Sequence, residues 1–92
     1  MASEIKRLFD TVRDEQLTCR QELLTLKADD SVARTVCIMT HSRRIASART
    51  RLQELIGNSA VDRVDEIIES VDHLFNAKRE QYEMQSHQKA GV

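Results

Sequence analysis

Three stretches of the chain carry residues of a buried face at alternating steps of three and four, the spacing that turns one side of a helix toward a partner helix. No proline and only two glycines occur in the 92 residues, so few residues oppose helix formation. The pattern predicts an almost entirely helical protein with coiled-coil-like heptad seams. The seams are Ile5, Phe9, Val12, Gln16, Cys19, Leu23 and Leu26; Ile38, His41, Ile45, Ala48, Leu52 and Leu55; and Val61, Val64, Ile68, Val71, Phe75, Lys78 and Tyr82.

Helix-capping residues separate the three stretches. The sequence DDS at 29–31 offers N-caps, and GNSAVD at 57–62 combines a C-terminal glycine with a capping-box-like start. A chain this short forms one domain, and short connections join antiparallel neighbours. We therefore expect an all-α fold, either a three-helix antiparallel bundle or a helical hairpin with the third helix docked. The expected single domain spans 1–85, with helices near 3–28, 31–56 and 59–85, and a flexible C-terminal tail spans 86–92.

Cysteine usage and the N-terminal segment indicate the compartment. The first ten residues carry charges where a secretion signal needs an apolar segment, and no run approaches the roughly 18 apolar residues of a membrane span. Cys19 and Cys37 fall among apolar helical positions, which favours free buried thiols over a disulfide or a metal pair. We expect a cytoplasmic protein of a reducing compartment with no membrane partner. A virus-encoded protein, or one delivered into a host, has the same features.

The segment VARTVCIM at 32–39 is apolar on two sides of its helix. At about 100° per residue, the seam lies on one side, whereas Val32, Val36 and Met39 lie nearly opposite. A second apolar side indicates contact with a second copy of the chain or with another helical protein. The alternative is that a curved first helix covers this side.

Arginines of the second helix and carboxylates of the third helix carry opposite charge. Residues 31–52 contain five arginines and no acid, a charge of +5, whereas residues 53–75 contain six acids and one arginine, a charge of −5. This predicts that the arginines face acids of the third helix, within one chain or between copies. The expected protein interface comprises Val32, Val36, Met39, Arg43, Arg44, Arg51, Asp65, Glu66 and Glu69.

The same arginines support an alternative, the binding of an anionic ligand such as a nucleic acid or nucleotide. Guanidinium and hydroxyl groups suit phosphate oxygens. A formal net charge of −1 and the absence of aromatic residues beside the arginines disfavour nucleic acid. The alternative anion site comprises Thr40, His41, Arg43, Arg44, Ser47 and Arg51.

Catalytic and metal motifs are not recognised in the sequence. There is no glycine-rich phosphate loop or nucleophile elbow, and the seam position of His41 is more typical of a hydrogen-bonded interface histidine than of a catalytic base. His73 and Glu69 lack the spacing of a di-iron site, and two distant cysteines give no zinc motif. We expect no enzyme activity, cofactor or metal. The predicted function is a non-enzymatic helical protein–protein interaction module that self-associates and acts as an adaptor, co-chaperone or regulatory inhibitor.

Overall fold

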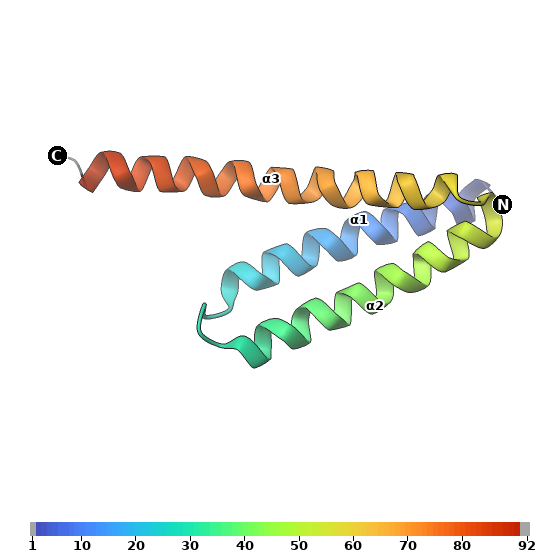
Figure 1. Cartoon of the computed structure of the whole chain (residues 1–92), viewed down its shortest axis with the longest axis horizontal. Helices are drawn as coiled ribbons and strands as arrows, with labels where there is room; N and C mark the ends of the chain where they lie inside the picture. Colours follow the sequence, from blue (N-terminus) through green and yellow to red (C-terminus); the bar gives the residue numbers. More distant parts are fainter. Residues whose placement is uncertain (1, 91–92) are drawn as a thin grey trace.

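The protein is a bundle of three helices, α1 (Ala2–Thr25), α2 (Ser31–Ile56) and α3 (Ser59–Ala90). The computed structural model describes the backbone of residues 2–90 and the side chains of residues 3–76, and contains no strand in the described backbone. The helices α1 and α2 form an antiparallel hairpin, and α3 returns along α1 and extends past the α1–α2 connection (Figure 1). The predicted all-α, three-helix fold is confirmed.

The connection between α1 and α2 is set by local hydrogen bonds. The hydroxyl of Thr25 donates to the carbonyl oxygen of Glu22 at 2.7 Å, and α1 ends there, three residues before the expected boundary at 28. The carboxylate of Asp30 accepts a hydrogen bond from the backbone N–H of Ala33 at 3.1 Å. This N-cap satisfies a donor that the first turn of α2 leaves free, so α2 begins at Ser31 as predicted.

A glycine ends α2. Gly57 has φ of +78°, a conformation that side chains with a Cβ rarely adopt, and its N–H donates to the carbonyl oxygen of Gln53 at 2.9 Å. The next helix begins two residues later and continues to Ala90, beyond the expected end at 85. Within the predicted tail, residues 86–90 therefore have a helical backbone, and residues 91–92 lie outside the described part of the chain. Flexibility of the tail stays a prediction.

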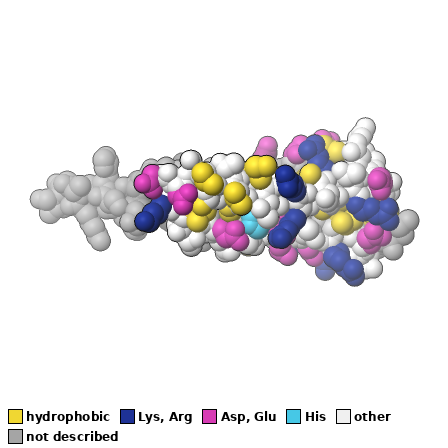
Figure 2. Space-filling model, turned by 90° about the horizontal axis from the view of Figure 1, so that it is seen from below, with side chains coloured by type: hydrophobic (Ala, Val, Ile, Leu, Met, Phe, Trp, Pro, Cys, Tyr) yellow, Lys and Arg dark blue, Asp and Glu magenta, His cyan; other side chains and the backbone are white. Residues whose placement is uncertain are grey.

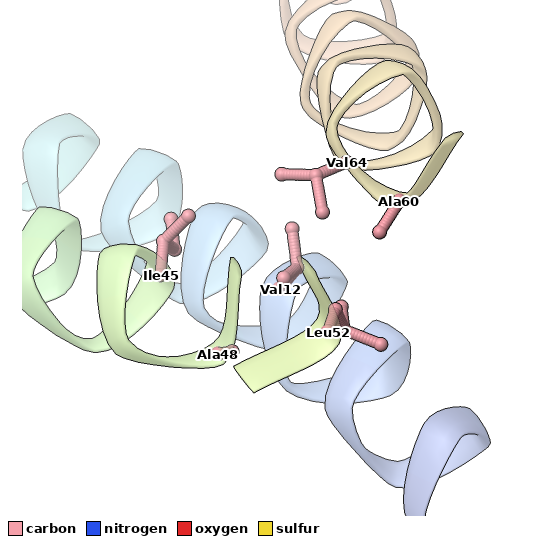
Figure 3. Packing of buried hydrophobic residues seen from close by; sticks show 6 residues of the cluster. All are labelled: Val12, Ile45, Ala48, Leu52, Ala60 and Val64. Atoms are coloured by element: carbon pink, nitrogen blue, oxygen red, sulfur yellow. The ribbon is translucent and has the colours of Figure 1, made fainter. Parts of the chain in front are cut away.

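The hydrophobic core lies where α2 turns into α3 and where α1 packs against both (Figure 3). Val12, Leu52 and Val64 contribute one fully buried side chain from each helix, which confirms that the three seams face one another in this part of the bundle. Lys78 and Tyr82 of the third seam lie outside the described side chains. Toward the 26–30 connection, however, the buried residues of the hairpin are Cys19, Cys37 and His41. The complete core cluster comprises Val12, Ile45, Ala48, Leu52, Ala60 and Val64.

The second apolar side of α2 is exposed. Val32, Val36 and Met39 keep 73%, 58% and 48% of their surface accessible, so the alternative in which α1 covers this side is wrong. Figure 2, which views the molecule from below in Figure 1 and so from the α2 side, shows hydrophobic side chains gathered on this face. Ile38, which we expected in the seam, is also 47% exposed, because it lies at the edge of the stripe that contacts α1.

Candidate functional site between α1 and α2

His41 lies in the α1–α2 interface with both ring nitrogens in contact with carboxylates of α1. Its Nδ1 is 2.5 Å from Oε2 of Glu15, and its Nε2 is 3.0 Å from Oε2 of Glu22. The histidine is only 5% exposed. Because positions 15 and 22 are one heptad apart, they lie on the same face of α1 and flank the ring. The predicted hydrogen-bonded seam histidine is confirmed.

The two carboxylates favour the protonated form of this imidazole. Hydrogen bonds to Glu15 and then to Glu22 raise the pKa of His41 above its ordinary value, against the opposing effect of burial. The hydrogen bond from His41 in turn lowers the pKa of Glu22, with a second contribution from Cys37. Both directions favour the pairing of an imidazolium with carboxylates over that of a neutral imidazole.

Cys37 adds a thiol to the same cluster. Its Sγ is 3.3 Å from Oε2 of Glu22, and burial raises the pKa of this thiol to about 12, so that the thiol is protonated and donates to the carboxylate. Cys37 and His41 are four positions apart on α2 and therefore point the same way. Cys19 and Cys37 are both free and buried, as predicted. One atom each from Glu22, Cys37 and His41 lies within 4.8 Å of the other two.

An open groove of about 610 Å³ lies beside this cluster. The groove brings the carboxylate, thiol and imidazole together with apolar and hydroxyl side chains from both helices. Glu22 is the accessible member of the cluster, with 51% of its side chain exposed, whereas Cys37 and His41 are buried. A small ligand therefore has a path to the cluster from solvent. The lining residues are Glu22, Thr25, Leu26, Ala33, Val36, Cys37, Thr40, His41 and Arg44.

Arg44 and Arg51 of α2 pair with carboxylates of α1, not of α3. Arg44 Nη1 is 3.5 Å from Oε1 of Glu15. Arg51 is 3.0 Å from Glu4 and 3.3 Å from Glu54 of its own helix. The expectation that these two arginines face acids of the third helix within one chain is wrong. The comparison of segment charges omitted Glu4, Glu15 and Glu22, which recur at spacings that place them on one face of α1.

The acidic stripe of α3 makes other contacts. Glu66 pairs with Arg63 one turn away at 3.1 Å. Asp72 accepts hydrogen bonds from Gln16 Nε2 at 2.7 Å and from Arg20 Nε at 2.8 Å, which explains the polar residue in the first seam. Among the predicted interface residues, Asp65 and Glu69 are exposed on α3. No ion pair joins α2 to α3 among the described side chains.

The alternative anion-binding residues do not form one pocket. Thr40, His41 and Arg44 line the groove beside α1, whereas Ser47 and Arg51 line another groove on α2. His41, Arg44 and Arg51 are all engaged with carboxylates. Arg43 is exposed and lines neither of these grooves. The carboxylates of α1 therefore largely balance the positive charge that the anion-binding alternative requires.

Sequence reasoning missed Glu15, Glu22 and the role of Cys37. Two signals were available. Cys37 and His41 have the four-residue spacing that places two ligands on one helix face, and Glu15 and Glu22 have heptad spacing in the stretch that was expected to pack against it. Each signal is weak alone, because neither predicts which residues of α1 lie opposite position 41.

Comparison of the chain with protein-family models, with curated proteins and with solved structures finds no match. Over the described residues, no helix combines the length and apolar character needed to cross a membrane. The function proposed below therefore depends on the geometry of the helices alone.

Proposed function

We propose that this protein is a non-enzymatic helical interaction module whose partner is a second copy of itself, bound through the outer face of α2. This outer face is defined by Val32, Val36, Met39 and Arg43, which recur at steps of four, three and four on the side opposite the buried seam. The observation that carries the proposal is the exposure of the three apolar members, at 73%, 58% and 48%. Apolar side chains at this spacing are typical of a helix that packs against another helix.

The apolar surface is suited to pairing between copies. Burial of one aliphatic side chain contributes about 1.5 to 3 kcal/mol. In a symmetric contact, each residue of the outer face is buried once in each of the two copies. The gain is offset by the free energy lost when two molecules associate. A small contact of this size therefore supports a dimer that forms at micromolar or higher concentration and dissociates on dilution.

Charge complementarity supports an antiparallel arrangement. In an antiparallel dimer whose two-fold axis passes Val36, Arg43 of one copy lies near the first turn of α2 of the other copy. Asp29 and Asp30 of that copy directly precede Ser31, the first residue of α2, and lie at the end of the contact that Arg43 approaches. Arg43 forms no ion pair among the side chains that the structure describes, so it is free to make this contact. Parallel pairing of the same helices places Arg43 against Arg43, which is unfavourable.

The surface outside the proposed dimer contact also offers apolar residues to a further partner. Leu24 and Leu74 are 75% and 60% exposed and lie outside the proposed contact. An adaptor, a co-chaperone or a regulatory inhibitor built on this dimer uses such exposed apolar residues to bind another helical protein.

The test is the molar mass measured by light scattering and sedimentation equilibrium over a wide concentration range. Wild-type protein is expected to form a dimer, and Val36→Glu is expected to remain monomeric with unchanged helicity, because it buries a charge in the contact. Ser42→Glu, an exposed change on another side of α2, is the matched control and keeps the dimer. A wild-type protein that stays monomeric at millimolar concentration would overturn the proposal.

A charge swap tests the antiparallel arrangement. Arg43→Glu is expected to weaken the dimer several-fold, and the added change Asp29→Arg is expected to recover part of the loss. If the dimer affinity of the double variant equals the sum of the two single effects, the copies do not meet in this register.

The anion-binding alternative is tested by titration with labelled RNA, DNA and nucleotides at physiological salt. Binding that is lost in Arg43→Ala would support this alternative.

A further inference from the structure

We propose that Glu22, Cys37 and His41 form a binding site for a zinc ion between α1 and α2. None of the three ligands belongs to the outer face of α2, although Val36 lines both that face and the groove. Zinc binding and dimer formation are therefore measured separately. The site combines a carboxylate from one helix with a thiol and an imidazole from the other. An ion held there would cross-link the part of the hairpin that lies outside the aliphatic core cluster.

The distances fit a tetrahedral ion. Oε2 of Glu22 lies 3.0 Å from Nε2 of His41 and 3.3 Å from Sγ of Cys37. Zinc binds sulfur at about 2.3 Å and nitrogen or oxygen at about 2.0 to 2.2 Å, so that two tetrahedral ligands are separated by roughly 3.3 to 3.6 Å. The third pair, sulfur and nitrogen, is also within 4.8 Å. Side-chain adjustments of a few tenths of an ångström up to about an ångström place all three atoms around one ion.

The ligand types select the metal. Thiolate, imidazole and carboxylate are the three groups that zinc uses in proteins, whereas calcium and magnesium require oxygen ligands. Binding exchanges protons for the ion. The thiol proton of Cys37 and the Nε2 proton of His41 leave to solvent, and the positive charge of zinc stabilises the thiolate that burial otherwise disfavours.

Glu15 supplies the positioning contact that zinc-bound histidines need. Its Oε2 accepts the Nδ1–H of His41 at 2.5 Å, which leaves Nε2 as the atom directed at the site. The other oxygen of Glu15 is 3.5 Å from Arg44, so the carboxylate is itself held in place. A carboxylate on the far nitrogen fixes the tautomer and the orientation of a metal-bound imidazole and increases its basicity.

Three protein ligands leave one position of a tetrahedral ion to another group. The groove lies on the accessible side of the cluster, and Glu22 is its exposed edge. A water molecule is therefore the expected fourth ligand. An open position of this kind distinguishes the site from a closed structural zinc site with four protein ligands.

The test uses cobalt as a spectroscopic substitute and zinc in competition with a chromophoric chelator. Wild-type protein is expected to bind one equivalent per chain and to show thiolate-to-cobalt charge-transfer absorption. Cys37→Ser should lose that absorption and most of the zinc affinity. Cys19→Ser changes a neighbour of Cys37 that is outside the set of converging ligand atoms, so it should keep the absorption and lose much less zinc affinity than Cys37→Ser. Glu15→Gln should bind zinc about 10- to 100-fold more weakly with the thiolate absorption retained.

Two results would overturn the site. One is zinc affinity that is the same in wild-type protein and in Cys37→Ser, and the other is an equal loss in Cys19→Ser. Far-UV circular dichroism of each variant shows whether the helices persist. If Cys37→Ser does not fold, cadmium-113 NMR of the wild-type protein decides the question. A signal in the range of one-thiolate sites supports the assignment, and a signal of oxygen and nitrogen ligands alone rejects it.

Discussion

The Nδ1 atom of His41 and the Oε2 atom of Glu15 are 2.5 Å apart, although the two residues are separated by 26 positions in the chain. This contact joins α1 to α2 in the half of the hairpin where cysteines and a histidine replace the aliphatic core. Hydrogen bonds between charged partners are shorter and stronger than neutral ones. The contact therefore holds α1 and α2 together in the part of the hairpin nearest the 26–30 connection, and it orients the groups around the groove.

The pH dependence of stability is the first expected consequence. The pKa of His41 is raised by Glu15 and Glu22 of α1, with Cys37 and Arg44 as its charged or titratable neighbours on α2. A raised pKa means that the imidazolium stabilises the folded state fully below the ordinary value of about 6.5 and that this contribution is lost as the pH rises through the folded pKa. We expect metal-free protein to lose stability as the pH rises above about 6.5 and through the raised pKa of His41 in the folded state.

Urea unfolding in the presence of a chelator measures this change. The variant His41→Gln removes the titrating group, so its stability should vary less over the same pH range. The opposite sign applies to Glu22, whose lowered pKa predicts a loss of stability when this carboxylate is protonated in acid. Equal slopes for wild-type protein and His41→Gln above pH 6 would contradict the assigned role of the histidine.

The second prediction concerns the partner of Arg51. Because Arg51 is 3.0 Å from Glu4 of α1, Arg51→Glu should be partly compensated by Glu4→Arg. Both side chains are nearly half exposed, so solvent weakens the ion pair and the expected coupling is small. Chemical unfolding of the two single variants and the double variant gives this coupling energy. Glu66→Arg, on α3, is the control and should show no coupling with Arg51→Glu.

The third prediction concerns the attachment of α3 to α1. Asp72 receives hydrogen bonds from both Gln16 and Arg20, so Asp72→Ala leaves two donors without their acceptor. The expected loss in the free energy of unfolding is about 1 to 2 kcal/mol, reduced by the partial exposure of these groups. Asp65→Ala removes an exposed carboxylate from the same helix and should cost less than about 0.5 kcal/mol. Similar unfolding curves for the two variants would show that Asp72 does not hold α3.

The sequence alone determined the helices and their buried faces. The seam predicted that Val12, Leu52 and Val64 are buried, and all three are. The N-cap at Asp30 and the glycine at Gly57 marked the boundaries of α2. These features are predictable because helix periodicity and capping depend on residues within one or two turns of each other.

Only the tertiary structure decided which side chains meet across helices. The rotation of α1 about its own axis places Glu15 and Glu22 opposite His41, and Glu4 opposite Arg51. Segment charge had favoured α3 as the source of carboxylates, since a sum of charges contains no information about which helix is adjacent or which of its faces is turned inward. The cluster of Glu22, Cys37 and His41 could not be predicted for the same reason. It forms from two helices whose relative rotation is set by packing of the distant aliphatic core.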